Sequence, residues 1–308
     1  MQERVAIITV LYNSSSVLPD FFRSLEGQTR RDFTLYAVDN ASPDDSLEQV
    51  QAWAGRVSFP VEVIRSETNA GIAAGNNRGI RAAREAGCRW FLLTNNDTVW
   101  EPDTLEILLA EAERHGAGMA VPKITIHGTD RLWYAGGSWN RLRGGTRHHG
   151  LGRRDRATRD EASRPVEYAP TCCMLIRDTV FERVGVMDER FFLYYDDADF
   201  VRRATRAGET LWYVPRSCLA HKESVSTGGV SPLAQYWLSR NLLLFTRKHY
   251  SAPYWCYVLA VHWAILLTKR AITFDRAQWT ACRRGILDGI EICRTPVRKI
   301  STEIGCTE

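Results

Sequence analysis

The sequence predicts an α/β fold, in which a doubly wound, mostly parallel sheet is followed by a helical C-terminal region. Two observations support the sheet: four short apolar, β-branched runs alternate with helical patterns over the first 115 residues, and polar residues cluster after each run. In such sheets ligands bind at the carboxyl ends of the strands, where these polar clusters would lie. The helical region is indicated by the amphipathic and uncharged stretches after residue 236.

The elements of the first half alternate regularly. Strands are expected at residues 5–10, 34–38, 61–66 and 89–93. The helices between and after them are expected at residues 17–28, 46–54, 69–86 and 101–115, the first capped by the serines at 14–16 and the third entered through a glycine-rich turn.

The regularity breaks after residue 122. Residues 141–164 hold eight arginines and hardly an apolar side chain, which is typical of a mobile basic surface loop able to close over an anionic ligand. Order resumes with a buried strand at 168–176, a helix at 178–184 and a short strand at 210–214. Residues 1–235 are therefore expected to form one domain.

The last part of the chain, residues 236–308, changes character. An amphipathic helix is expected at 236–250, and residues 251–268 contain no Asp, Glu, Lys or Arg but several Trp and Tyr. This stretch is short for a transmembrane span and carries His262. Two interpretations stay open: a helix lying on a membrane surface between basic flanks, or a buried helix that packs on the first domain or on a second copy in a homodimer.

Composition excludes some classes of function. A net charge of +4 on 308 residues does not favour nucleic acid as a partner. Eight cysteines without a Cys-x-x-Cys pair indicate buried thiols in a reducing compartment, and the N-terminal residues do not read as a signal sequence, so we expect a cytoplasmic protein. The absence of G-x-G-x-x-G after the first strand and of G-x-x-x-x-G-K-[ST] removes support for dehydrogenases and P-loop enzymes.

Residues 187–203, MDERFFLYYDDADFVRR, place carboxylates beside aromatic side chains. One interpretation is a solvated helix start, in which acidic side chains in the first turn interact favourably with the helix dipole. The other is a semi-dry pocket in which aromatic walls tune carboxylates for acid–base chemistry. The roles of two single residues also stay open. Asp39 either binds a nucleobase or ribose or caps a local turn, and His221 is either a ligand or a structural histidine.

Six motifs in order resemble one family: TVLYN (9–13), VDNASPDDS (38–46), NAGIAAGNNRG (69–79), LLTNNDT (92–98), GVMDERFFLYYDDADFVRRATRAG (185–208) and VPRSCLAHKES (214–224). Over residues 4–250 the chain resembles the inverting glycosyltransferases of family 2, which have the Rossmann-like GT-A fold, and within them the bacterial rhamnosyltransferases of O-antigen, cell-wall and capsule assembly.

The resemblance implies a donor site and a metal site. Asn95-Asn96-Asp97 stands in place of the family's Asp-x-Asp motif, so Asp97 is the one charged ligand there. With His221 it would bind Mg²⁺ or Mn²⁺. The implied donor-binding residues are Thr9, Tyr12, Asn13, Asp39, Asn69, Gly71, Asn76, Asn95, Asn96 and Asp97.

The resemblance also implies a mechanism. An acceptor hydroxyl attacks the anomeric carbon in line while Asp197 takes its proton, and Asp196 stands where the family usually has Glu. The acceptor wall and its support would be Phe192, Tyr194, Tyr195, Asp199 and Arg203.

The expected substrates are dTDP-rhamnose as nucleotide-sugar donor and a glycan or lipid-linked glycan as acceptor, with the enzyme peripheral on the inner face of the membrane. A UDP- or GDP-sugar donor with a small-molecule acceptor is the alternative. A nucleotidyltransferase would carry a basic, glycine-rich loop where this chain has TVLYNSSS. A glycoside hydrolase would leave the strand-end loops without a purpose. A non-enzymatic, membrane-associated binding protein would bind liposomes without turning over a nucleotide sugar.

Overall fold

The structure is a computed structural model that describes residues 4–156, 161–222, 231–272 and 275–294. The chain divides into two compact units, residues 1–230 and 231–308, and each is described here by itself. Parts of the expected basic loop (157–160) and of the expected C-terminal region (273–274 and 295–308) lie outside the described residues.

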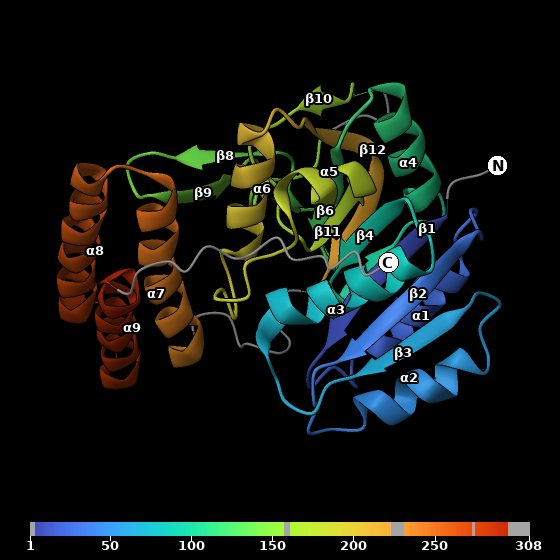
Figure 1. The fold of residues 1–308 in the computed structure, drawn as a ribbon, viewed down its shortest axis with the longest axis horizontal. Coiled ribbons are helices and arrows are strands. Elements are labelled where there is room, and N and C mark those ends of the chain that lie inside the picture. The colour runs from blue at the N-terminus through green and yellow to red at the C-terminus, as the bar shows by residue number, and fades with distance from the viewer. Residues whose placement is uncertain (1–3, 157–160, 223–230, 273–274, 295–308) are drawn as a thin grey trace, which may run out of the picture. The chain divides into compact units, whose positions relative to one another are not determined.

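The first unit is built on a ten-stranded sheet within the described residues (Figure 1). The strands are β1 (Val5–Leu11), β2 (Phe33–Asp39), β3 (Val61–Arg65), β4 (Trp90–Thr94), β5 (Thr98–Trp100), β6 (Met119–Ile126), β7 (Leu132–Tyr134), β10 (Arg164–Pro165), β11 (Cys173–Arg177) and β12 (Leu211–His221), and a separate hairpin is formed by β8 (Gly137–Asn140) and β9 (Gly145–His148). The central order is β10-β12-β6-β11-β4-β1-β2-β3, with β5 paired to β12 and β7 to β6.

The expected mostly parallel, doubly wound sheet is confirmed. The pairs β1–β2, β2–β3, β1–β4 and β6–β12 are parallel, whereas β11 runs antiparallel to both of its neighbours. Parallel strands end at the same edge, so the polar turns after β1, β2 and β4 lie together there.

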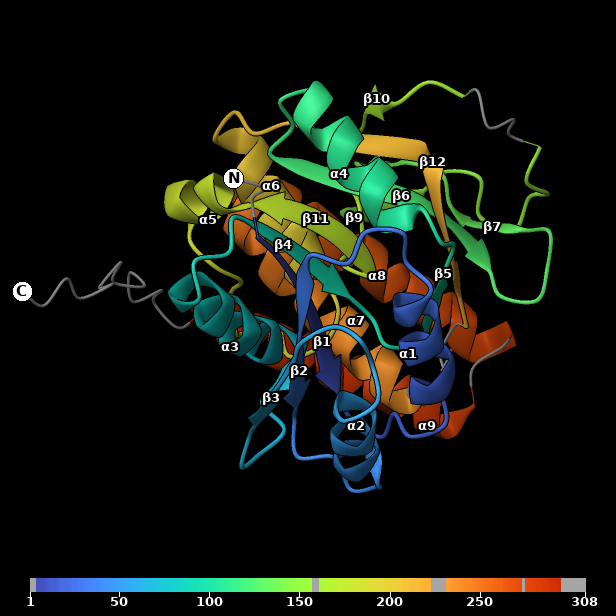
Figure 2. The ribbon, with the colours of Figure 1, turned by 90° about the vertical axis from the view of Figure 1, so that its right-hand side faces the viewer.

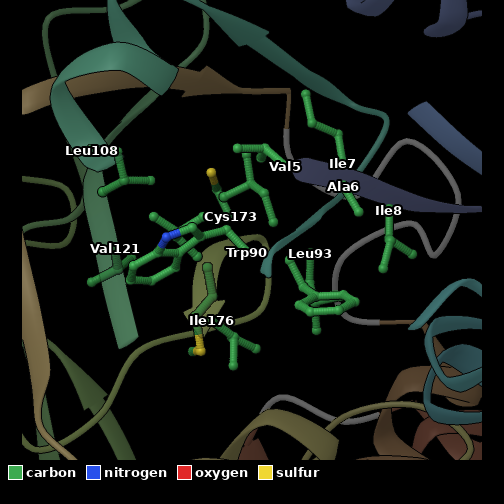
Figure 3. Packing of buried hydrophobic residues seen from close by; sticks show 14 of the residues in the cluster. Val5, Ala6, Ile7, Ile8, Trp90, Leu93, Leu108, Val121, Cys173 and Ile176 are labelled. Atoms are coloured by element: carbon green, nitrogen blue, oxygen red, sulfur yellow. The ribbon is translucent and has the colours of Figure 1, made fainter. Parts of the chain in front are cut away.

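Helices cover both faces of the sheet. Figure 2 shows α3 (Gly71–Glu85) and α5 (Asp178–Val184) on one side of the strands, and α1 (Leu18–Glu26) and α4 (Thr104–Arg114) on the other. Side chains from β1, β4, β6, β11 and α4 meet in the buried core, as Figure 3 shows for Val5, Trp90, Val121, Ile176 and Leu108. The remaining helices of this unit are α2 (Ser46–Ala54) and α6 (Asp196–Arg206).

The glycines of α3 explain how closely that helix approaches the sheet. A Cβ on Gly75 would lie 2.7 Å from a methyl carbon of Val10, and one on Gly79 would lie 2.5 Å from a methyl carbon of Ile8. Without these side chains the helix packs directly onto β1, and its N-terminus lies at the ligand-binding edge of the sheet.

The structure differs from the sequence expectation between residues 98 and 165. The sequence did not predict β5 to β8, and β9 and β10 lie within residues 141–164, where it predicted a loop. Apart from β6, which has eight residues and is mostly buried, these strands have two to four residues and gain their order by pairing with other segments. The strand expected at 210–214 also continues to His221, with a register shift between Val214 and Cys218.

The second unit contains α7 (Pro232–His249), α8 (Ala252–Ile272) and α9 (Arg276–Arg294), the last of which the sequence analysis did not predict. Helices α7 and α9 pack closely at Gly285 and Gly289, because neither residue has a Cβ. A Cβ on Gly285 would lie 2.3 Å from the carbonyl oxygen of Tyr236, and a Cβ on Gly289 would lie 2.9 Å from the carbonyl oxygen of Arg240. The small core around Leu243 includes Leu266 and Ile286. In the described part of the chain, no helix has the length and apolarity that crossing a membrane requires.

Candidate active site

The carboxyl ends of β1 and β2 form the first wall of the site. Leu11 and Asp39 are register partners, and the backbone amide of Asn40 donates to the carbonyl of Leu11. Asp39 is buried, and its Oδ1 accepts from the backbone amide of Ser42 at 3.2 Å, the local turn that the sequence left open. No described residue reaches its other oxygen, Oδ2, so Asp39 is a turn cap and still has a carboxylate oxygen for a ligand.

The turn before α3 forms the second wall. The Asn40 amide donates to Oδ1 of Asn69 at 2.8 Å and to the carbonyl of Gly71 at 3.2 Å. Gly71 has φ +88°, and a Cβ there would lie 2.4 Å from the carbonyl oxygen of Phe192, which accepts a hydrogen bond from the amide of Ile72. Only glycine fits this left-handed, crowded position, and it joins the donor-side turn to the segment that leads into α6.

The turn between β4 and β5 forms the floor. The Asn96 side chain is buried and donates to the carbonyl of Val10 at 2.8 Å, which ties this turn to the end of β1. Asn95 is exposed, and its backbone amide donates to the carbonyl of Cys172 at 3.0 Å. Asn96 therefore supports the floor, whereas the side chain of Asn95 is free to meet a ligand.

Asp97 and His221 face each other at this floor. Strand β12 pairs with β5, so that His221 is the register partner of Thr98, and the amide of Lys222 donates to the carbonyl of Asp97. Asp97 Oδ1 lies 3.1 Å from His221 Nε2. Both atoms are buried, and neither has a hydrogen-bond partner in suitable geometry among the described residues.

An oxygen and a nitrogen donor left unsatisfied side by side fit a divalent cation. The described residues contain no cluster of three or more His, Cys, Asp or Glu able to hold a metal ion. Asp97 and His221 would therefore supply two ligands, and the remaining ligands of such an ion would come from substrate and water.

Asp196 and Asp197 begin α6 at the opposite side of the site. They follow Tyr194 and Tyr195, which have φ of 64° and 66°. Two successive non-glycine residues in the left-handed region store backbone strain, which is often found at functional sites. This turn places both carboxyl groups at the helix N-terminus, where backbone amides face them.

The two carboxyl groups differ in their surroundings. Burial raises the pKa of Asp196 to about 8, and the neighbouring charge of Asp197 acts in the same direction. Burial also raises the pKa of Asp197, but the Tyr168 hydroxyl and the backbone amides of Ala198 and Thr171 oppose this effect. Both carboxyl groups therefore hold a proton more readily than a free aspartate does, and the hydrogen-bond donors around Asp197 favour its ionised form.

Residues 171 and 172 connect the two sides of the site. Thr171 donates a backbone hydrogen bond to Asp197, and the carbonyl of Cys172 accepts from Asn95. The Cys172 thiol lies close to His221, and burial raises the pKa of the thiol. Asp97, His221 and Asp197 thus belong to one site.

Several residues from the sequence analysis lie elsewhere or act as support. Asn76 is buried, and its amide lies 3.7 Å from the sulfur of Met187. Asp199 is fully buried in an ion pair with Arg203. Thr9 is buried in β1, while Tyr12 and Asn13 are exposed just beyond that strand.

The sequence analysis missed residues around Asp197 and His221 that come from outside the motifs. Tyr168, which donates to Asp197, precedes β11, and the Trp133 ring packs edge-on against His221 with ring centroids 4.6 Å apart. His148 lies between them: its ring centroid is 4.7 Å from that of Trp133 and 5.8 Å from that of Tyr168. No periodicity marks these residues, because the sheet and the β8–β9 hairpin bring them together.

Comparison with known proteins identifies the family of this chain. The family described as "Glycosyl transferase family 2" matches residues 6–185. The "N-acetylglucosaminyl-diphospho-decaprenol L-rhamnosyltransferase" of Mycobacterium tuberculosis is 27% identical over 270 residues, which cover 80% of this chain and 86% of that protein. The "dTDP-rhamnosyl transferase RfbF" of Shigella flexneri is 25% identical over 225 residues, covering 70% of this chain and 69% of that one.

Solved structures agree on the fold. The mannosyltransferase PcManGT from Pyrobaculum calidifontis, determined with GDP-Man and Mn²⁺, has a TM-score of 0.57 and 15% identity, and the match covers 94% of this chain and 87% of that one. At this identity the likeness concerns the fold alone, a mostly parallel sheet flanked by helices.

Proposed function

The chain belongs to glycosyl transferase family 2 and is a glycosyltransferase with the GT-A fold, and from that premise we propose that it transfers L-rhamnose from dTDP-rhamnose to a hydroxyl of a lipid-linked glycan with inversion. The donor is suggested by relatives named as rhamnosyltransferases, and the acceptor by a relative named for a diphospho-decaprenol substrate. A UDP- or GDP-sugar donor with another acceptor is the alternative.

One observation carries the mechanism. Asp197 accepts hydrogen bonds from the neutral Tyr168 hydroxyl and Ala198 amide, and it lies beside Asp196, whose pKa burial raises to about 8. Two carboxyl groups with separated pKa values provide one group ready to accept a proton. An inverting transfer requires such a base for the attacking acceptor hydroxyl.

Different residues would bind the donor, the metal ion and the acceptor. Asp39 would bind the nucleoside, and the glycine turn at Asn69 and Gly71, held by Asn40, would let the backbone approach the donor closely. Asp97 and His221 would hold Mg²⁺ or Mn²⁺, which when bound neutralises charge on the diphosphate. The aromatic side chains of Phe192, Tyr194 and Tyr195 would form the acceptor wall.

Asp197→Asn tests the base directly. The amide cannot take the proton, so we expect kcat to fall by about 10²–10⁴-fold while the affinity for dTDP-rhamnose, measured by calorimetry, is unchanged. Asp130→Asn, which alters an exposed ion pair with Arg154, is the matched control and should retain full activity. Near-normal turnover by Asp197→Asn would refute the proposed base.

A donor panel and metal removal test the remaining parts. The purified protein is incubated with dTDP-rhamnose, UDP-sugars and GDP-mannose, with EDTA, Mg²⁺ or Mn²⁺. We expect hydrolysis or transfer with dTDP-rhamnose and a divalent ion. Preference for a UDP- or GDP-sugar would support the alternative donor, and indifference to both EDTA and Asp97→Ala would remove the metal site.

A further inference from the structure

We propose that Tyr168 is a positioning residue for the base: its hydroxyl holds the Asp197 carboxylate in the orientation that receives the acceptor proton. This inference rests on the proposed role of Asp197 and adds a residue from outside all six sequence motifs. Tyr168 is buried and lies at the start of the segment that leads into β11.

The hydrogen bonds to Asp197 leave room for an acceptor. The Tyr168 hydroxyl donates to Oδ2 at 2.7 Å, and the backbone amide of Ala198 donates to Oδ1 at 2.6 Å. With a donor on each oxygen the carboxylate cannot rotate freely. Because each oxygen has two lone pairs, it can still accept a proton from a substrate hydroxyl.

Tyr168 acts as a donor and not as a base. Burial raises the pKa of Tyr168 well above its ordinary value, and the Asp197 carboxylate raises it further, so the phenol stays protonated wherever Asp197 is ionised. Its hydrogen bond favours the charged form of Asp197 and lowers the pKa of that carboxyl. Orientation and ionisation of the base therefore depend on one hydroxyl.

Tyr168 is itself held firmly. The Tyr134 hydroxyl donates to the carbonyl oxygen of Tyr168 at 2.6 Å. A Cβ on Gly137 would lie 2.6 Å from that oxygen and 2.9 Å from the Tyr168 ring, so the hairpin strand β8 rests directly on this residue. The rings of Trp139 and His148 pack beside it, with centroids 5.7 and 5.8 Å away. A group that positions a base needs this kind of rigid support.

Thr146 on β9 extends the hydrogen-bond chain. Its side chain forms a hydrogen bond with the Tyr168 hydroxyl, and this bond lowers the pKa of the phenol. Donation from Thr146 polarises the phenol and strengthens its bond to Asp197. The hairpin thus contributes to the base through Thr146 and Tyr168.

The titratable groups around Asp197 come from more than one element. The groups that interact with it are Asp196 and Tyr195 at the start of α6 and Tyr168 and Cys172 from the segment before β11. Of these, only Tyr168 has a side chain that donates to the carboxylate, among the described residues. Its removal should therefore have a distinct pH signature.

The test compares two phenol deletions. In Tyr168→Phe we expect kcat to fall about tenfold and the acid limb of the kcat/KM profile to move up by about one pH unit, with KM for the donor unchanged. The limb moves up because the pKa of Asp197 rises once its donor is lost. Tyr213→Phe is the control, since Tyr213 is also buried but its hydroxyl has no hydrogen-bond partner among the described residues. Its pH profile should match that of the wild type.

Thr146→Val gives a graded second variant. It keeps the β-branched shape and should shift the acid limb in the same direction by less. A folded Tyr168→Phe with the wild-type acid limb would overturn the inference; if that variant does not fold, an unchanged limb in Thr146→Val would do so. Turnover retained by Asp197→Asn is a separate outcome, because it refutes the base and not the hydrogen bond.

Discussion

Asp197 and Asp199 lie in the first turn of the same helix and have opposite surroundings. Asp199 is fully buried, and its Oδ2 accepts from Nε of Arg203 at 2.9 Å. Arg203 also donates to the carbonyls of Val184 and Val186, which fixes α6 to the end of α5. Asp197 is half-buried, and the groups that donate to it are neutral.

The difference separates a structural carboxylate, Asp199, from the proposed base, Asp197. A guanidinium partner stabilises the charged carboxylate and leaves it little tendency to take a proton. Neutral donors orient a carboxylate but leave its charge uncompensated, so that it keeps an affinity for protons. The same residue type in one turn of helix thus serves two purposes, and mutations should separate them.

The largest expected effect is on stability at Asp199. Asp199→Asn leaves Arg203 without its charge partner, so we expect the free energy of unfolding to fall by about 3–5 kcal/mol. Urea unfolding measures this change. At a temperature where the variant stays folded, kcat should remain close to that of the wild type.

Asp197→Asn is the matched comparison for this experiment. It removes no ion pair and should leave the free energy of unfolding almost unchanged while activity is lost. If Asp199→Asn is as stable as the wild type, or if Asp197→Asn unfolds as readily as Asp199→Asn, the distinction between the two carboxylates is wrong.

The next effect is a dependence of stability on pH through Asp196. Its pKa in the folded state is about 8, above the ordinary value of an unfolded aspartate. Between these two values the unfolded state loses a proton that the folded state keeps, so stability falls as pH rises from the unfolded pKa to the folded one. Asp196→Asn cannot ionise and should flatten this part of the profile, measured by urea unfolding across pH.

Asp44 provides a control of opposite sign. Burial raises the pKa of Asp44, but hydrogen bonds from Ser46 and Ser15 outweigh burial and lower it below the ordinary value. The stability that Asp44 contributes is present above the pKa of the unfolded state. It is lost as the pH falls through the pKa of the folded state. Asp44→Asn should therefore alter only the acidic end of the profile. If the free energy of unfolding of Asp196→Asn falls between about pH 4 and 8 as steeply as that of the wild type, Asp196 is not the group responsible for the slope.

The smallest difference is expected between two glycine variants, one of which alters the backbone contact between the donor-side turn and the segment at Phe192. Gly71 and Gly87 both have left-handed φ, but only Gly71 lies against another segment, the backbone of Phe192. Both Gly→Ala variants should lose about 1–2 kcal/mol to backbone strain. Gly71→Ala should lose about 1–3 kcal/mol more through steric overlap, together with donor affinity. Equal losses in thermal unfolding would show that the contact with Phe192 contributes nothing.

Much of the fold could be predicted because its signals are local. The first four strands and their helices follow from apolar periodicity, and the glycine-rich start of α3 follows from its composition. Strands β5, β7, β8, β9 and β10 could not be predicted, because their order comes from pairing with β6 and β12 or within a hairpin. Helix α9 was missed because its arginines and glycines weaken its apolar pattern, and the packing of Gly285 and Gly289 on α7 shows why those glycines are tolerated.

By itself the sequence determined the fold class, the glycosyltransferase family and the acidic motif at the start of α6, because these depend on residue order and local spacing. The resemblance assigned proton transfer to Asp197 and a supporting role to Asp199, and the tertiary structure added the different surroundings of the two carboxylates. Only folding brings Tyr168 to one and Arg203 to the other. The chemistry of a carboxylate is set by the donors around it, and those donors come from segments that are distant in the chain.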